Sequence, residues 1–213
     1  IGNILFVFRA IPMTPNPMQT VEAPDGRRIM IGWMQNWDTL SHRCEESKWF
    51  AQMSLPRELS VKNGRLYQKP VRELDAIRKS KTEYRNVVVK DKPVMLKGVQ
   101  GRTIDMELAI SPEDKETGYG KFTVCFAQNE KFYTELSFCP EDSVLKLDRK
   151  LSGSRRAVVH EKSCLVNRKT DELKLRMILD RYSVEVFVND GEQVMSMVIF
   201  TEQEADGISF QAN

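Results

Sequence analysis

A two-residue alternation near the C-terminal end of the sequence constrains the fold more than any other feature. Over residues 183–188, three valines alternate with Glu185 and Phe187. This period is typical of a β-strand whose two faces meet different surroundings. Asn189-Asp190-Gly191 follows directly, and these residue types accept the positive φ angles of a tight turn. A second alternation over residues 194–199 then predicts an antiparallel hairpin.

Similar short segments, separated by turn-forming residues, recur along most of the chain. We expect strands at 29–34, 49–55, 59–62, 65–68, 85–89, 103–110, 122–128, 131–138, 144–147, 157–165, 173–179, 183–188, 194–200 and 207–211. Only residues 71–79, after Pro70, have helical spacing. Many short strands at this spacing predict an all-β fold, a β-sandwich of two antiparallel sheets.

Composition excludes several classes of function. The 32 basic and 30 acidic residues are interspersed, which argues against a nucleic-acid ligand. The four cysteines are scattered without a Cys-x-x-Cys pair and there are only two histidines, so we expect no metal and no cofactor. Reduced thiols favour a cytoplasmic location. The apolar run at residues 4–8 is too short to span a membrane and is poor as a signal peptide.

The sequence divides into two units near Pro56. All three tryptophans, Trp33, Trp37 and Trp49, precede this point. We therefore expect one unit at residues 1–55 and a second at 56–213. The first unit is too short to bury a core alone.

Four blocks of sequence, in order, carry a resemblance to a known family. They are residues 25–37 (DGRRIMIGWMQNW), 49–59 (WFAQMSLPREL), 68–74 (QKPVREL) and the hairpin at 179–192. Together they resemble glycoside hydrolase family 32, the β-fructosidases that include invertase, sucrose-6-phosphate hydrolase, levanase and inulinase. The resemblance covers about residue 22 to the C-terminus, and four ordered blocks are more specific than one short motif.

The resemblance implies a five-bladed propeller that carries the chemistry, followed by a β-sandwich. Residues 1–55 would be an N-terminal arm and a remnant of the last propeller blade, and residues 56–213 the sandwich. The family's catalytic residues lie in Asn-Asp-Pro-Asn, Arg-Asp-Pro and Glu-Cys motifs, none of which occurs in this sequence. We therefore expect no catalytic residues here and no activity from this chain alone.

The acidic residues of the sequence fit structural roles better than catalysis. A retaining glycosidase needs two carboxyl groups about 5 Å apart. No local pattern in this sequence would bring two carboxyl groups together in that way. Three adjacent pairs are expected to be solvated: Glu45-Glu46, Glu113-Asp114 and Glu141-Asp142. We expect Glu58 to form an ion pair or hydrogen bond at the junction of the two units, Glu185 to meet a charged partner, and Asp180 to begin a turn.

Trp33 and Trp37 are the candidate substrate-binding residues. An indole offers a flat apolar platform to a sugar ring and an N–H donor at its edge. In the family, an aromatic residue of the last blade helps to line the fructose pocket, and Trp33 matches that region. Packing within an incomplete blade is the alternative role. His42 and His160 lack nucleophilic partners, so we expect structural roles for both.

Two functions follow as hypotheses. In the first, the chain is the C-terminal sandwich of a β-fructofuranosidase that, when complete, hydrolyses sucrose, sucrose phosphate or fructans. In the second, it is a free-standing carbohydrate-binding or interaction module. A surface that faces a propeller in the family would remain apolar in such a module, so self-association is also expected.

Overall fold

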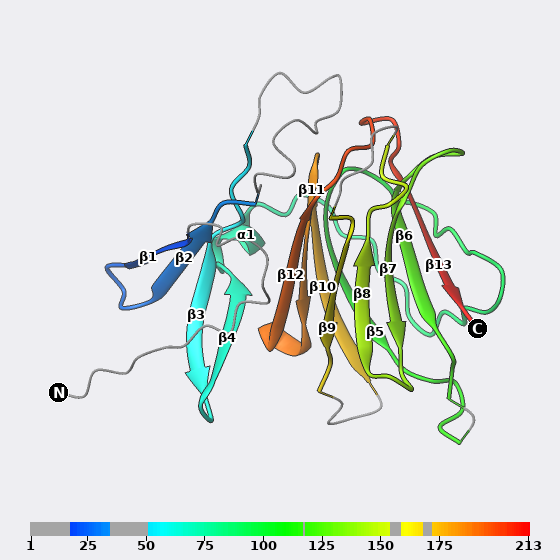
Figure 1. The fold of residues 1–213 in the computed structure, drawn as a ribbon, viewed down its shortest axis with the longest axis horizontal. Helices are drawn as coiled ribbons and strands as arrows, with labels where there is room; N and C mark the ends of the chain where they lie inside the picture. The colour runs from blue at the N-terminus through cyan, green and yellow to red at the C-terminus, as the bar shows by residue number, and fades with distance from the viewer. Residues whose placement is uncertain (1–17, 35–50, 117, 154–158, 168–171) are drawn as a thin grey trace.

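The computed structural model describes residues 18–34, 51–116, 118–153, 159–167 and 172–213. The strands of these residues form three antiparallel sheets (Figure 1). The first, the N-terminal sheet, is a four-stranded meander in the order β1-β2-β3-β4. Its strands are β1 (Met18–Glu22), β2 (Arg28–Gly32), β3 (Arg57–Lys62) and β4 (Arg65–Pro70).

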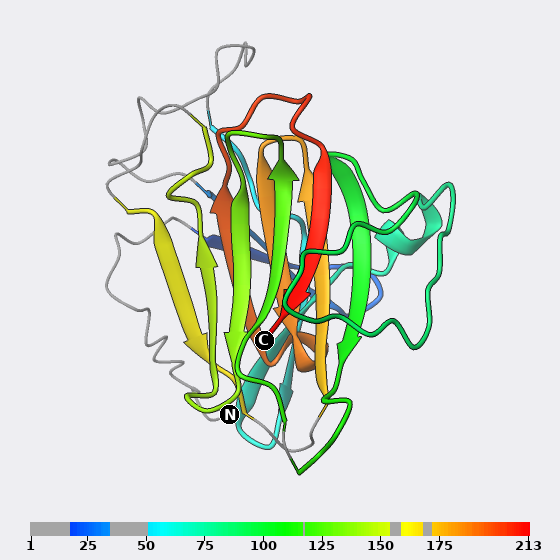
Figure 2. The ribbon, with the colours of Figure 1, turned by 90° about the vertical axis from the view of Figure 1, so that its right-hand side faces the viewer.

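The other two sheets form a sandwich, whose layers lie one behind the other in Figure 2. The central sheet has the order β12-β11-β10-β5. It contains β5 (Thr103–Ile110), β10 (Leu173–Asp180), β11 (Ser183–Val188) and β12 (Gln193–Val198). The five-stranded sheet has the order β13-β6-β7-β8-β9. It contains β6 (Phe122–Gln128), β7 (Thr134–Cys139), β8 (Val144–Asp148), β9 (Glu161–Leu165) and β13 (Gly207–Ala212).

The main hydrophobic core lies between the two sandwich sheets. Alternate residues of each strand point inward, as a period of two requires. The largest side chains that are fully buried include Phe126, Phe138, Leu145, Met177 and Val184. The predicted all-β sandwich is therefore confirmed.

The predicted hairpin is also present. Strands β11 and β12 pair antiparallel from Ser183–Val198 to Val188–Gln193. The turn between them is a short 3-10 segment, η2 (Asn189–Gly191), whose three residues have φ angles of 46°, 62° and 90°. All six residues of β11 are buried. The strand is covered on both faces because the N-terminal sheet packs against the side that faces away from the main core.

Three predicted elements differ from the structure. Residues 85–89 form no strand. The chain that follows them contacts β13 through a bridge between Val94 and Phe210 and through a hydrogen bond from Ala212 N–H to the Lys90 carbonyl. Of the predicted strand at 49–55, residues 49 and 50 lie outside the described residues, and in the rest only Met53 forms a bridge. The predicted helix is present as α1 (Glu73–Ala76) and is shorter than expected.

The strand pairing bears on the division of the chain near Pro56. Strand β3 pairs with β2 through Arg28–Leu59 and neighbouring residues, and β4 pairs with β3 along its whole length. The N-terminal sheet thus continues to Pro70, and a boundary at 55/56 separates β2 from β3 within one sheet. The change in tryptophan content on which this boundary relied carries no information about strand pairing.

Two further observations concern the described residues. Cys125, Cys139 and Cys164 are free. In the described part of the chain, no helix has the length and the apolar character needed to cross a membrane.

Candidate functional site

Trp33 lies where the N-terminal sheet ends. It follows β2 directly and forms an antiparallel bridge with Met53. Its side chain is half-buried. Trp37 lies outside the described residues, so the structure does not bring the two candidate tryptophans together. Their proposed role as a sugar platform stays a prediction.

Backbone hydrogen bonds hold Trp33 in place. Ser54 N–H donates to the Gly32 carbonyl at 2.7 Å, and Gly32 N–H donates to Ser54 Oγ at 3.0 Å. Next to Trp33, Met34 N–H donates to the Gln52 carbonyl at 2.9 Å. The Met34 side chain packs against Val198 at the end of β12. The segment that carries Trp33 is therefore fixed against the sandwich.

A buried ion pair joins the N-terminal sheet to the central sheet. Arg57 of β3 donates through Nε to Glu185 Oε2 at 3.0 Å and forms a second bond to the same oxygen through Nη2. The two side chains are only 9% and 3% exposed. Leu55 N–H donates to the other Glu185 oxygen at 2.5 Å. The expectation that Glu185 meets a charged partner is confirmed.

Arg57 makes further contacts on both sides of this junction. Its Nη1 donates to Gln68 Oε1 of β4 at 2.9 Å, and its Nη2 donates to Ser196 Oγ of β12 at 2.5 Å. Its guanidinium carbon also lies 5.6 Å from the centroid of the Phe187 ring. One arginine thus contacts strands of two sheets, which orients them relative to each other.

The hairpin turn rests on β4. A Cβ atom added to Gly191 would lie 2.0 Å from the Gln68 carbonyl oxygen, so only glycine allows this approach. Ion pairs flank the contact, since Arg65 meets Glu192 at 2.6 Å and Lys69 meets Asp190 at 3.3 Å. The hairpin predicted from the sequence is therefore part of the interface between the N-terminal sheet and the sandwich.

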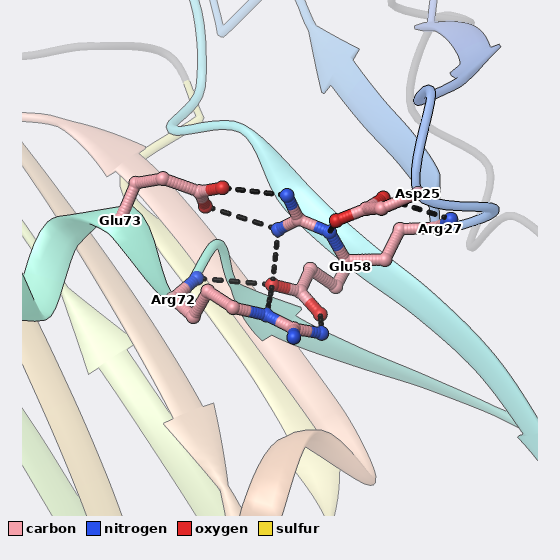
Figure 3. A network of polar contacts seen from close by, with 5 residues as sticks. All are labelled: Asp25, Arg27, Glu58, Arg72 and Glu73. Atoms are coloured by element: carbon pink, nitrogen blue, oxygen red, sulfur yellow. Dashed lines mark hydrogen bonds and ion pairs between the residues drawn. The ribbon is translucent and has the colours of Figure 1, made fainter.

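A second polar network closes the junction near α1 (Figure 3). Arg27, from the β1–β2 turn, donates to Glu58 at 2.8 Å and pairs with Glu73 of α1 at 2.5 Å. Glu58 also accepts from Arg72, through the backbone N–H and the guanidinium, each at 3.0 Å. The predicted ion-pair role of Glu58 at the junction is confirmed.

A third network ties α1 to the outer face of the central sheet. Asp105 of β5 accepts hydrogen bonds from Arg78 at 2.8 Å and from Arg176 of β10 at 2.9 Å. Arg176 also pairs with Asp75 of α1 at 2.8 Å. The acidic side chain of Asp105 on this face is therefore covered by two arginines.

The electrostatics of these networks do not suit acid catalysis. A general acid of a glycosidase needs a carboxyl group whose pKa is raised. Hydrogen bonds from Arg72, and then from Arg27, lower the pKa of Glu58 to about 2. Arg176 and Arg78 lower the pKa of Asp105 against the opposing effect of burial. Among the described carboxyl groups with a resolved shift, every pKa is lowered.

The other acidic pairs that the sequence singled out are solvated where the structure describes them. Glu113, Asp114, Glu141 and Asp142 are all exposed, as expected. Glu45-Glu46 and His42 lie outside the described residues. These carboxyl groups therefore form no site with a second acidic residue in the part of the chain that the structure covers.

One cluster in the described residues has the composition of a metal site. Ligand atoms of Asp148, His160 and Glu161 lie within 4.8 Å of one another. The Lys146 ammonium group pairs with Glu161 at 2.8 Å and with Asp148 at 3.8 Å. A positive charge of the protein thus already balances these carboxylates, and the cluster is explained by ion pairing.

Sequence reasoning missed two residues of the junction, Arg57 and Gly191. It assigned a structural role to Glu58 and to Glu185, but it did not pair Glu185 with Arg57, which lies 128 residues away in the sequence. Gly191 was recognised only as a turn residue. The available signal was the lone acidic Glu185 within an apolar alternation, because a buried charge requires a partner.

Comparison with known proteins places both units in one family. The sequence profile described as "Glycosyl hydrolases family 32 C terminal" matches residues 73–213. The profile described as "Glycosyl hydrolases family 32 N-terminal domain" matches residues 17–70. The match to the N-terminal domain ends at Pro70, where β4 and the N-terminal sheet end.

Individual relatives agree with the profiles. A probable sucrose-6-phosphate hydrolase of Vibrio cholerae is 31% identical over 191 residues, which is 90% of this chain and 32% of the relative. A levanase of Bacillus subtilis is 30% identical over 203 residues, which is 90% of this chain and 29% of the relative. The chain thus spans about a third of the length of these curated relatives.

A solved structure shows the same fold. The sucrose-6-phosphate hydrolase from Lactobacillus gasseri superposes with a TM-score of 0.73 at 24% sequence identity. The match covers 91% of this chain and 38% of that protein.

Proposed function

Because the chain belongs to glycoside hydrolase family 32, we propose that it is the C-terminal sandwich and last-blade portion of a β-fructofuranosidase-type enzyme. In this role it is structural, and the hydrolysis of sucrose, sucrose 6-phosphate or fructans depends on the rest of the enzyme. The observation that carries the proposal is the buried contact between Arg57 and Glu185. It fixes a sheet of the family's N-terminal domain against the sandwich.

The described carboxyl groups support a structural role. Glu58 and Glu185, nearest the junction, accept hydrogen bonds from arginines. For Glu58, these bonds lower the pKa to about 2, which keeps its carboxylate ionised and acceptor-only. An ionised, arginine-paired carboxylate donates no proton to a leaving group. The polar residues of the junction therefore hold the two units together and leave the chemistry to other residues of the enzyme.

A hydrolysis assay tests this proposal. The chain of residues 1–213 would be incubated with sucrose, sucrose 6-phosphate, inulin and levan, and released fructose would be measured. We expect no turnover above a heat-denatured control. Turnover that increases in proportion to protein concentration would overturn the structural role.

Sugar binding by Trp33 is a separate part of the proposal. Trp33 is half-buried, which leaves part of the indole for a ligand. Isothermal titration with fructose and sucrose would compare the wild-type chain with Trp33→Ala and Trp33→Phe. We propose that Trp33→Ala weakens binding more than Trp33→Phe does, because phenylalanine retains an aromatic face. Equal affinities in all three proteins would remove Trp33 from the site.

The exposed strand β1 favours a second candidate function, that of an interaction module. All five residues of β1 are exposed, including Met18 at 50% and Val21 at 63%. Among the described strands, β1 ends the N-terminal sheet and pairs with β2 alone. An unpaired edge strand with apolar side chains is a site for strand addition.

We propose that a second copy of the chain uses this edge when no other strand covers it. Sedimentation velocity over a range of concentrations would detect the association. Val21→Lys places a charge on the edge and is expected to yield a monomer, while Val61→Lys at the far side of the sheet serves as the control. A monomer at all concentrations in the wild-type chain would exclude self-association.

A cytoplasmic location is also proposed. The free thiols of Cys125, Cys139 and Cys164 support it. Cell fractionation of the source organism, followed by immunodetection, tests the location, and recovery outside the cytoplasmic fraction would contradict it.

A further inference from the structure

Two cations lie side by side where the sandwich sheets meet at β9 and β12. Lys162 of β9 is opposite Leu147 of β8, and Arg149 N–H donates to the His160 carbonyl at 2.8 Å. This register makes Lys162 and Arg149 diagonal neighbours on one face of the sheet. The Cα atoms of such neighbours lie about 7–8 Å apart. Leu147 on the same face is fully buried, so both side chains point toward the inside of the sandwich.

Both cations reach across to the edge of β12. Lys162 Nζ donates to the Ser196 carbonyl at 2.7 Å, and Arg149 Nη1 donates to the Val198 carbonyl at 2.7 Å. Ile199 N–H, one position further along, donates to the Tyr182 carbonyl at the start of β11. Carbonyl groups two residues apart share one edge of a strand and lie about 7 Å apart. The two cations therefore line the outer edge of β12 next to each other.

The positive charge at this edge exceeds the negative charge. Arg57 also contacts Ser196, but Glu185 neutralises it. Within the described ranges of the chain, Lys162 and Arg149 contact carbonyl groups and form no ion pair with a carboxylate. The guanidinium of Arg149 also lies 4.8 Å from the centroid of the Phe200 ring. Among the residues that the structure describes, these two charges thus have no acidic partner.

Burial makes this arrangement costly for the chain alone. It lowers the pKa of Lys162 to about 8, with further contributions from Arg149 and Arg57. It also lowers the pKa of Arg149 to about 10. Buried charges in proteins are normally paired with an opposite charge. An anion between the two side chains would supply that partner.

We propose that Lys162 and Arg149 form a binding site for a phosphate group. Counting contacts to the described residues, Lys162 has two unused N–H donors and Arg149 has one on each terminal nitrogen. A tetrahedral oxyanion with a hydrogen bond of about 2.8 Å on each side bridges nitrogens separated by up to roughly 8 Å. A phosphate carries about −1.5 to −2 charges at pH 7 and balances two cations, whereas a carboxylate balances one. The site is independent of the proposed function.

A purely structural role is the competing explanation, in which Lys162 and Arg149 cap the carbonyl groups at the edge of β12. Charged side chains at a sheet edge also prevent another strand from pairing there. Capping requires only the carbonyl contacts and gives no dependence on phosphate. The two explanations therefore differ in whether phosphate stabilises the folded chain.

Thermal unfolding of the chain of residues 1–213 would be measured against inorganic phosphate at constant ionic strength, with sodium chloride as the balancing salt, at pH 7.0. We expect the melting temperature to rise saturably with phosphate, because a ligand that binds only the folded state stabilises it. The rise should be absent in Lys162→Met and present in Lys162→Arg, which retains the charge. Lys150→Met, which removes an exposed lysine beside Arg149, should respond as the wild-type chain does.

Circular dichroism would confirm that each variant is folded, and phosphorus NMR would measure binding directly. The same titration with glucose 6-phosphate and with glucose distinguishes free phosphate from phosphate carried on a sugar. A larger response to glucose 6-phosphate assigns the site to a sugar phosphate, and a larger response to inorganic phosphate assigns it to the free anion. An absent response, an equal response in Lys162→Met, or an equal response to glucose would overturn the proposal.

Discussion

Arg57 and Glu185, 128 residues apart in the sequence, form a buried ion pair that joins two sheets of the molecule. The pair is surrounded by acceptors and donors that complete it, including Leu55 N–H and Ser196 Oγ. Such a pair is a poor source of net stability but a strong constraint on geometry, because neither charge tolerates the loss of the other.

Removal of one partner of the ion pair should therefore strongly destabilise the fold. Glu185→Ala leaves Arg57 buried without a counter-charge, and we expect the free energy of unfolding to fall by about 3–5 kcal/mol. Replacement of both residues, Arg57→Met with Glu185→Leu, should cost less than the single change. Urea unfolding measures both. Glu113→Ala, at an exposed position, is the control, and a Glu185→Ala loss no larger than this control would contradict the interpretation.

Gly191 offers a test of the contact between the hairpin and β4. Gly191→Ala meets the Gln68 carbonyl oxygen, and overpacking of this kind costs about 1–3 kcal/mol. Gly26→Ala is a matched control, because Gly26 also has a positive φ, 82°, but has open space around it. Both variants share a conformational cost of about 1–2 kcal/mol. We expect only Gly191→Ala to speed hydrogen exchange in β4, and equal exchange in both variants would refute the contact.

Acid should loosen the network around Glu58. The folded-state pKa of about 2 lies below the ordinary value of 4.5, so the ionised carboxylate stabilises the fold above pH 4.5. That contribution is lost as the pH falls from 4.5 toward 2. The carboxylate is partly exposed, which limits its contribution to about 1 kcal/mol at neutral pH. Unfolding free energies of Glu58→Gln and the wild-type chain should converge near pH 2. A difference that persists there would exclude an ionic origin.

Lys162 should give a pH dependence of the same direction in an alkaline window. Its folded-state pKa of about 8 lies below the ordinary 10.5, so between these values the unfolded chain binds more protons. Stability should then rise with pH across this window, as Lys162 becomes neutral beside Arg149 and Arg57. Cys125 and Cys164, whose pKa values burial raises to about 11, act in the other direction. The difference between wild type and Lys162→Met isolates the lysine, and parallel pH profiles would contradict this assignment.

Local sequence patterns predicted the sandwich well, because burial on one face imposes a period of two. The valines of β11 follow this period, and the Asn189–Gly191 turn has the positive φ angles that its residue types predict. The same rule predicted a strand at residues 85–89, and this prediction was wrong. Val87 and Val88 are β-branched but 40% and 53% exposed, so strand propensity was present without a sheet edge to pair with.

Other features depended on contacts that no local pattern contains. Strand β1 is exposed along its whole length and has no burial pattern to detect. Pairing of β2 with β3 crosses a gap of 24 intervening residues, from Gly32 to Arg57, so no local pattern indicated it. The partner of Glu185 is likewise defined only by the folded chain. The sequence indicated that a partner was required, while the fold determined which one.

The double burial of β11 has a consequence for how such proteins can diverge. One face of this strand belongs to the sandwich core, and the other carries the acceptor for an arginine of the N-terminal sheet. The N-terminal sheet and the sandwich are thus exchangeable between relatives only as a matched set. A sandwich transferred from another member of the family would dock here only if its equivalent strand supplied both an acid for Arg57 and a turn without a side chain at the place of Gly191.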